Sequence, residues 1–407
     1  MTPATRSTRS TRVTPFGPDA TDIQVLSVVR ELASRCAAED ARRDAERILP
    51  YDEIRDLGEA GLFTLTVPKA HGGPEVSTRT LGEVFTELTA GDASIGQIPQ
   101  NHYFFVNVLA SAGTPDQQAF FYEEILQGRH FGNALSERGS RTARDFEIGF
   151  ARQPDGSRIL HGTKYYATGA LFAHWIPVYA TDEEGRVHAA WVPADDPGVS
   201  VEDDWNGMGQ RTTGSGTVRF EHVRVPAERI VPVYTIFEKD EVFGAFGQYL
   251  HAAIDTGIAV AALRDGKRLI HELARPRKET GLDRAADEEA VIDLFGGLAL
   301  RVRTARALLR EAGEAVDAAR ADLNSRTAAE ASAAVAAARA HSDEVALKVS
   351  SGIFELIGTR AADRALRLDR HWRNARTHTL HDPRRLKLRY LGGWELNDTP
   401  PPANGLV

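Results

Sequence analysis

The order of hydrophobic and polar residues divides the chain into three parts, and the first of them is helical. From about residue 22 to residue 129, apolar residues recur mostly at three- and four-residue steps, as at Val25, Val29 and Leu32. This is the spacing that places side chains on one face of a helix. The stretch TLGEVFTELTAGD keeps the same period and stops at Gly91. We therefore predict a set of amphipathic helices.

The pattern changes between about residue 132 and residue 233. Short runs combine aromatic and β-branched residues, and Gly, Pro and Asp interrupt them; they are SRILHGTKYYATGA, HWIPVYATD, VHAAWVPAD and GTVRFEHVRVP. Such runs are typical of strands separated by turns. We predict a compact antiparallel β domain.

Helices return from about residue 243 to residue 389, and they are long. The run EEAVIDLFGGLALRVRTARALLREAGEAVDAARADL keeps six apolar residues on one face, namely Val291, Leu294, Leu298, Val302, Ala305 and Leu309. An alanine-rich segment with high helix propensity follows. Two such helices predict a bundle whose length suits packing against copies of itself, so we expect a homotetramer or a homodimer.

These patterns predict an α+β chain that is mainly α. The expected parts are a disordered tail at 1–20, a helical domain at 21–131, a β domain at 132–235, a helical bundle at 236–392 and a tail at 393–407. The first residues, MTPATRSTRSTRVTPFG, also have the composition of an organellar transit peptide, which stays as an alternative to the tail.

Charge and cysteine content narrow the class of protein. The 407 residues carry 49 Lys and Arg against 57 Asp and Glu, and no basic stripe is present, so nucleic acid is not an expected partner. The single cysteine, Cys36, has no partner for an internal disulfide, which fits a reducing compartment. No long uncharged apolar window occurs, so we expect a cytoplasmic protein without membrane spans.

Two short segments could carry chemistry. GNALSERGS, residues 132–140, lies where helices give way to strands, and KYYATGA, residues 164–170, lies inside the β domain. Each carries a hydroxyl, Ser136 or Thr168, beside glycine and residues able to pack against a flat ring. Ser, Thr and Gly are also ordinary turn residues, so plain turn chemistry remains open.

Together with the domain order, these segments resemble the acyl-CoA dehydrogenase superfamily over nearly the whole chain. NALSERG stands where that family has aromatic-x-x-Thr-Glu-Pro-Gly along the flavin, and Tyr166, Ala167 and Thr168 stand where it has Trp-Ile-Thr. The resemblance implies an acyl-CoA dehydrogenase-like fold with a middle antiparallel β-barrel-like domain and a C-terminal four-helix bundle. It implies flavin contacts from Asn133, Leu135, Ser136, Tyr166 and Thr168, with Thr168 at the flavin N5 edge.

One departure from the dehydrogenases concerns the base. A dehydrogenase needs a carboxylate to remove the proton next to a thioester, and many members carry it in a C-terminal YEGT-type stretch. This chain has RTHTLHDP there, and no glutamate lies between Glu355 and Glu395. A dehydrogenase with a relocated base is therefore the alternative function.

HWRNARTHTLHDP, residues 371–383, gives a more specific resemblance. With DDWNGMGQRTTGSG, residues 203–216, and ARPRKETGLDRAAD, residues 274–287, it resembles the dibenzothiophene and sulfone monooxygenase branch of the same superfamily. That branch implies reduced flavin, FADH2 or FMNH2, which reacts with O2 to give a C4a-hydroperoxide. The expected substrate is an aromatic heterocycle, indole-like or dibenzothiophene-like, or an organosulfur compound.

Histidine suits such a reaction because it donates a hydrogen bond or a proton near neutral pH. His378 and His381, at H-x-x-H spacing, can present both imidazoles on one side of a helical turn or loop. By resemblance His381 faces the flavin and His378 supports it, while Asn133 supplies an amide where dehydrogenases have a ring.

The remaining site predictions carry alternatives. We expect His102, Tyr103 and Trp205 in the substrate pocket, although a surface or capping role for His102 and plain packing for Trp205 remain open. Arg275 or Arg277 is expected at the flavin phosphate, with a solvated basic pair as the alternative.

No G-x-G-x-x-G or G-x-x-x-x-G-K-[ST] sequence suggests a site for NAD(P)H or a nucleoside triphosphate. The resemblance therefore implies a separate NAD(P)H:flavin reductase that delivers reduced flavin. Two further alternatives are a metal site at His371, His378, His381 and Asp382, and a non-catalytic helical scaffold. No histidine has a Glu three positions before it, so a di-iron bundle site is not expected.

Overall fold

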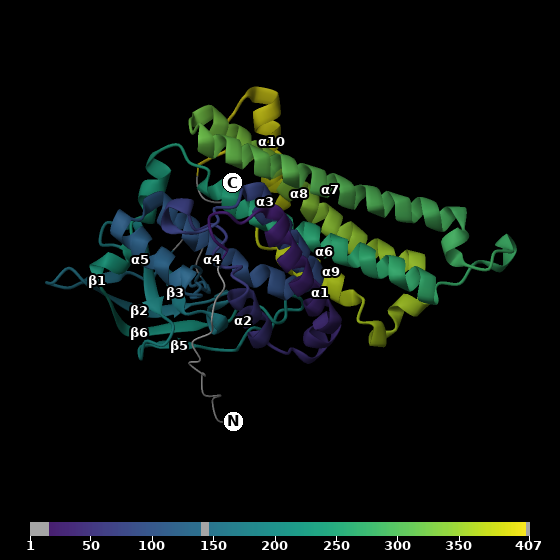
Figure 1. Ribbon diagram of the computed structural model, residues 1–407, viewed down its shortest axis with the longest axis horizontal. Coiled ribbons are helices and arrows are strands. Elements are labelled where there is room, and N and C mark those ends of the chain that lie inside the picture. The colour runs from purple at the N-terminus through teal and green to yellow at the C-terminus, as the bar shows by residue number, and fades with distance from the viewer. Residues whose placement is uncertain (1–15, 140–145, 404–407) are drawn as a thin grey trace.

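A computed structural model describes residues 16–139 and 146–403 of the chain. Helices, two small sheets and then longer helices follow one another, and the strands lie at one end of the molecule (Figure 1). The predicted tail at 1–20 falls mostly outside the described residues. No helix in the described ranges is long and apolar enough to cross a membrane.

The N-terminal part contains the five helices α1 (Asp22–Glu46), α2 (Tyr51–Glu59), α3 (Thr78–Gly91), α4 (Ala93–Ala112) and α5 (Pro115–Leu126). Local sequence fixes their starts. Thr21 and Thr114 each begin a helix with a capping box, and Pro115 occupies the first helical position of α5. Asp92 separates α3 from α4, because its carboxylate accepts hydrogen bonds from the backbone of Ser94 and Ile95.

The middle part holds seven strands, β1 (Phe150–Arg152), β2 (Arg158–Lys164), β3 (Trp175–Thr181), β4 (Val187–Pro193), β5 (Val199–Val201), β6 (Val218–Val225) and β7 (Ile230–Val231). They form two antiparallel sheets, in the orders β1-β2-β6-β5 and β3-β4-β7. Val178 from one sheet and Phe220 from the other belong to the same buried cluster. The four predicted runs each contain a strand, whereas β1, β5 and β7 are too short to show a period of two.

The C-terminal part consists of α6 (Phe243–Leu273), α7 (Glu289–Ala321), α8 (Ser325–Ile357), α9 (Asp369–Thr379) and α10 (Arg384–Asn397). The helices α6, α7 and α8 lie side by side, and α10 packs on α8 (Figure 1). The predicted fold class is confirmed. The last helix runs five residues past position 392, where the bundle was expected to end.

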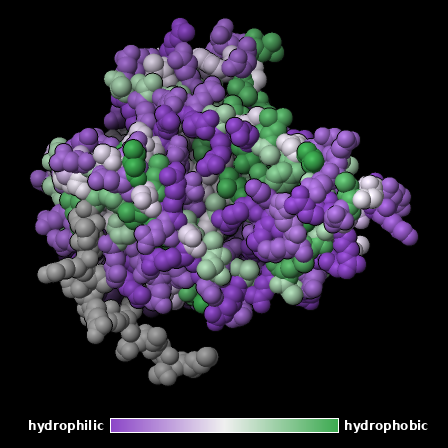
Figure 2. Space-filling model, turned by 45° about the vertical axis from the view of Figure 1, so that its right-hand side comes forward, coloured by the Kyte–Doolittle hydropathy of each residue, from purple (hydrophilic) through white to green (hydrophobic). Residues whose placement is uncertain are grey.

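Only half of the predicted apolar face on α7 is buried in this chain. Val302, Ala305 and Leu309 are buried, but Leu294 is 48% exposed and Leu300, nearby on the helix, is 62% exposed. Hydrophobic surface also gathers in the upper part of the molecule, where the C-terminal helices lie (Figure 2). The apolar side chains in the first turns of α7 are therefore not buried within one chain.

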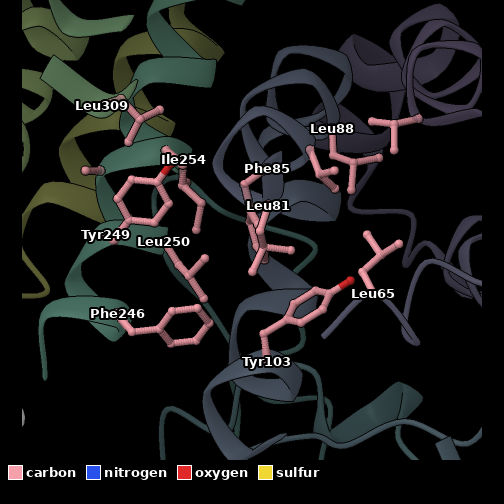
Figure 3. Packing of buried hydrophobic residues seen from close by; sticks show 14 of the residues in the cluster. Leu65, Leu81, Phe85, Leu88, Tyr103, Phe246, Tyr249, Leu250, Ile254 and Leu309 are labelled. Carbon is pink, nitrogen blue, oxygen red and sulfur yellow. The ribbon is translucent and has the colours of Figure 1, made fainter. Parts of the chain in front are cut away.

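The N-terminal and C-terminal helices share one core. Leu81 and Phe85 of α3 face the side chains of Phe246, Tyr249, Leu250 and Ile254 on α6, and Leu88 belongs to the same buried cluster (Figure 3). Glycine allows this close packing. A Cβ atom at Gly257 would lie 2.5 Å from Cβ of Thr89 and 2.7 Å from the carbonyl oxygen of Thr86.

Replacing Gly257 by Ala should therefore lower the free energy of unfolding by about 1–3 kcal/mol, because the added methyl group forces α6 away from α3. Gly58→Ala is the matched control. Its Cβ would lie 3.7 Å from the ring of Phe63, an ordinary contact, so we expect a gain of about 0.5–1 kcal/mol. Urea unfolding of both variants measures the difference, and equal stability of the two would contradict this account of the interface.

Candidate active site

The predicted histidine pair meets α6 in the interior of the bundle. Nδ1 of His378, on α9, lies 2.6 Å from Oδ1 of Asp255. Its Nε2 lies 3.0 Å from Nδ1 of His251, which stands one turn before Asp255 on α6. All three residues are buried. Sequence reasoning missed His251 and Asp255, although two polar residues four positions apart in the apolar run YLHAAIDTGIAV are a usable signal.

His381 lies beside this group, two residues beyond the end of α9. Its ring packs against that of His251, with centroids 4.2 Å apart and planes 31° apart. Protein surrounds the imidazole, and this burial together with His378 and Arg339 lowers its pKa. The residue as a whole is nevertheless exposed to water. The imidazole thus packs against the buried ring of His251 while part of the residue stays in contact with water.

Arg339 of α8 completes the group. Its Nη1 donates to Oδ2 of Asp255, and both side chains are almost fully buried. Burial alone opposes ionisation of Asp255, but Arg339 and His378 outweigh it and lower the pKa of the carboxyl. The neighbouring Asp343 behaves differently, since burial and the charge of Asp255 raise its pKa to about 6.

A chain of hydroxyl groups connects the β domain to α9, the helix that carries His378. Oγ1 of Thr168 lies 2.7 Å from Oγ of Ser215, which lies 2.6 Å from Oγ1 of Thr213. Thr213 donates to the carbonyl oxygen of Gln210, and the backbone N–H of Gln210 donates to Oδ1 of Asn374 at 2.7 Å. Asn374 precedes His378 by one helical turn on α9. Thr168 is thus linked through one loop to the helix that carries the histidine.

Asn133 and Tyr166 lie together at the same end of the β domain. The Nδ2 atom of Asn133 donates to the carbonyl oxygen of Tyr166 at 3.2 Å, while its Oδ1 is buried without a hydrogen-bond partner among residues 16–139 and 146–403. Tyr166 has a positive φ of 57° and its side chain is 51% exposed. Its ring centroid lies 6.1 Å from that of Trp205. The buried Oδ1 of Asn133 and the exposed ring of Tyr166 therefore belong to residues in direct contact.

The rest of the NALSERG segment is built into the protein. The carbonyl oxygen of Ser136 accepts from the backbone N–H of Tyr165, and Leu135 is half-buried. Glu137 accepts from Nζ of buried Lys164 at 2.6 Å and from two backbone N–H groups. The acidic residue of this segment thus holds the backbone in place.

The structure places His102 and Tyr103 in the core, away from any open pocket. Both ring nitrogens of His102 have backbone partners, the carbonyl oxygen of Phe63 at 2.7 Å and the N–H of Phe131 at 3.2 Å. The Tyr103 hydroxyl donates to the carbonyl oxygen of Leu62 (the ring is seen in Figure 3). Their side chains are 0% and 2% exposed. Their face of α4 packs on the segment after α2, and a place beside a substrate pocket stays a prediction for both.

Trp205 and the two arginines are placed differently. Trp205 is half-buried beside Tyr166, and its Nε1 donates to the carbonyl oxygen of Gln210. Arg275 and Arg277 are exposed in the loop between α6 and α7. That loop lies at the opposite end of the bundle from the strands (Figure 1). One chain therefore does not bring either arginine to Thr168.

The four possible metal ligands fall into separate groups. His371 pairs with Asp265, which also binds Arg370, and Asp382 pairs with Lys387. Within residues 16–139 and 146–403, no three His, Cys, Asp or Glu side chains are arranged to hold a metal ion.

Sequence comparison agrees with this architecture. Residues 20–129 match the N-terminal domain of acyl-CoA dehydrogenases, residues 133–223 the middle domain and residues 249–383 the C-terminal domain. The chain belongs to the acyl-CoA dehydrogenase family.

Within this family, relatives of the chain at about 30% identity include several monooxygenases. It is 31% identical to the dibenzothiophene monooxygenase of Rhodococcus qingshengii, over 93% of this chain and 94% of that protein. It is also 31% identical to a probable FMNH2-dependent monooxygenase, SfnC, of Pseudomonas putida, over 92% and 95% of the two chains. The structure of TdsC from Paenibacillus sp. A11-2 with FMN and indole superposes with a TM-score of 0.89, at 29% identity, over 94% of this chain and 100% of that one. The chain belongs to the monooxygenase branch of the family.

The buried imidazoles of this acyl-CoA dehydrogenase family member make its stability depend on pH. Burial lowers the pKa of His102, His130, His251 and His371, that of His102 to about 4. The unfolded chain binds protons near pH 6.5, so the stability from these neutral rings is present above pH 6.5 and is lost as the pH falls toward the folded-state pKa values.

We therefore expect the free energy of unfolding to fall between pH 7.5 and pH 5.5, by about 1 kcal/mol from His102 alone, with the other three rings adding in the same direction. Asp343 opposes this, because its raised pKa favours the folded state below about pH 6. Urea denaturation at the two pH values tests the balance, and an unchanged or rising stability would contradict it.

Proposed function

We propose that this protein is a two-component flavin-dependent monooxygenase, which takes reduced flavin and O2 and transfers one oxygen atom to an aromatic heterocycle. One observation carries the choice over the dehydrogenase alternative. Asp255, the carboxylate next to the histidines, is held by Arg339 and His378 and has no freedom to remove a substrate proton. The neighbouring side chains that could act on a substrate are imidazoles.

The residues at the domain junction fit a flavin. The free Oδ1 of Asn133 matches a ring N–H donor, and the exposed ring of Tyr166 offers a flat surface. The Thr168 hydroxyl, oriented by Ser215, would hold the N5 edge. Leu135 and Ser136 would line the ring. Once bound, reduced flavin supplies the activation of O2.

The protein's own groups would control protons and water at this cofactor. His381, which is exposed to water, would donate a hydrogen bond to the oxygen being transferred, with His378 as its support. The ring of Trp205 lies beside that of Tyr166 and would exclude water from one side of the cofactor. Such exclusion matters because water diverts activated oxygen to hydrogen peroxide.

The substrate class follows from aromatic surfaces and from the relatives. Tyr166 is 51% exposed, and Trp205 lies beside it. Flat heterocycles stack on such rings. TdsC, which shares the fold, was crystallised with indole and FMN. We therefore propose an indole-like or dibenzothiophene-like substrate with FMN as the preferred flavin, delivered by a separate NAD(P)H:flavin reductase.

We also propose that the enzyme is a homo-oligomer, a homotetramer or a homodimer. The exposed leucines of α7 leave apolar surface in contact with water. Arg275 and Arg277 lie far from Thr168 within one chain. A second copy packed along α7 would satisfy both observations, by burying the leucines and by bringing one arginine to a neighbouring flavin phosphate.

Removing the hydroxyl of Thr168 or the imidazole of His381 should uncouple the reaction. With a flavin reductase, NADH, FMN and indole, Thr168→Val and His381→Ala should each form about 10²-fold less product per NADH and release hydrogen peroxide instead. Thr163→Val, an exposed threonine on the same segment, is the control and should remain coupled. Unchanged product yield in both site variants would refute the assignment.

A charge on the exposed face of α7 should dissociate the oligomer. Leu300→Glu should lower the mass measured by light scattering after size-exclusion chromatography, since a carboxylate buried without a partner is costly. Leu323→Glu, at a 46% exposed leucine after the end of α7, should leave the mass unchanged. A monomeric unmodified protein would show that the α7 face is not an interface.

A further inference from the structure

The hydrogen bonds around His378 determine which ring nitrogen carries each proton. Asp255 is ionised, so its Oδ1 accepts, and Nδ1 of His378 at 2.6 Å must be the donor. If His378 is neutral, its Nε2 is an acceptor. His251 must then donate from Nδ1 across the 3.0 Å contact, which leaves Nε2 of His251 without a proton. The acceptor at Asp255 thus determines which nitrogen carries the proton in both rings.

The charged groups around His378 are largely paired with one another. Arg339 of α8 pairs with Asp255 of α6, and both are buried. Asp382, before α10, pairs with Lys387 at 2.6 Å. Asp343 of α8 has its pKa raised to about 6 by burial and by the charge of Asp255. Asp255 is thus the carboxylate that His378 contacts directly.

We propose that Asp255, His378 and His251 form a positioning relay, in which Asp255 fixes the tautomers of both rings and His251 holds the ring of His381 through the packing of the two imidazoles. The role in catalysis rests on the function proposed above. The arrangement of protons does not, because it follows from this chain's own side chains. His251 and Asp255 are positioning residues, since they act through His381.

The same two helices carry a matched pair without a second histidine. Asp265 stands ten residues after Asp255 on α6, and His371 stands seven residues before His378 on α9. Nε2 of His371 lies 2.9 Å from Oδ2 of Asp265, and both residues are largely buried. No contact between this pair and His381 is found in the described chain, so it provides a control for burial and for loss of a His–Asp bond.

Asp255→Asn gives a specific prediction. Arg339 donates to the side chain at position 255, so the new amide should turn its oxygen toward the guanidinium and its NH2 toward His378. Nδ1 of His378 must then accept, and its proton moves to Nε2. His251 must in turn accept at Nδ1 and carry its proton on Nε2. Both rings should change tautomer together.

Solid-state 15N NMR of the protein labelled in histidine reads these protons directly. The His378 and His251 signals are those lost in His378→Gln and His251→Gln. At pH 7.5 both rings should be protonated on Nδ1 alone in the unmodified protein, and on Nε2 alone in Asp255→Asn. The signals of His371 should not change in Asp255→Asn. If either ring of the unmodified protein is protonated on Nε2 or on both nitrogens, the relay is wrong, whether or not Asp255→Asn folds.

The catalytic role is read from coupling with reductase, NADH, FMN and indole. Asp255→Asn should lower product per NADH by about tenfold or more, as a wrong tautomer does elsewhere, with NADH consumption retained. His371→Gln should stay coupled. Normal coupling in a folded Asp255→Asn with changed tautomers would overturn the positioning role. If the unmodified protein oxygenates nothing, the proposed function fails, while the NMR result still decides the relay.

Discussion

A buried carboxylate in the middle of the bundle constrains the structure around it. Asp255 is inaccessible to water and lies in a mostly apolar stretch of α6, between Ile254 and Thr256. An ionised group in such a place is tolerated only when partners replace its hydration. Arg339 from α8 and His378 from α9 do so, and the three helices α6, α8 and α9 are thereby fixed in register.

That constraint reaches the β domain through α9. Asn374, one turn before His378, accepts from the backbone of Gln210, and the loop at Gln210 continues through Thr213 and Ser215 to Thr168. The close approach of this loop to α9 requires Gly209, because a Cβ there would lie 2.1 Å from the carbonyl oxygen of Arg373. Hydroxyl and imidazole groups from different domains are thus tied into one structure.

The same arrangement accounts for the difference in chemistry within the acyl-CoA dehydrogenase family. A base must be free to change its protonation state, whereas Asp255 receives donors from both sides. The other polar groups next to Asp255 and along the loop to Thr168 are imidazoles and hydroxyls, which can donate hydrogen bonds. A fold that serves desaturation in some members can therefore serve oxygen transfer in others without a change in the order of its helices and strands.

The sequence by itself determined the helices, the four longer strands, the fold class and the branch of the family, because these depend on local periodicity and on motifs that are contiguous in the chain. It also pointed to His378, Thr168 and Asn133 as candidates. Only the tertiary structure decided which candidates meet, since side-chain contacts across 127 positions, as between His251 and His378, leave no local pattern. His102 shows the limit in the other direction. A histidine at this position suggested a role in the substrate pocket. In the folded chain both of its ring nitrogens are hydrogen-bonded to backbone groups, and the residue lies in the core.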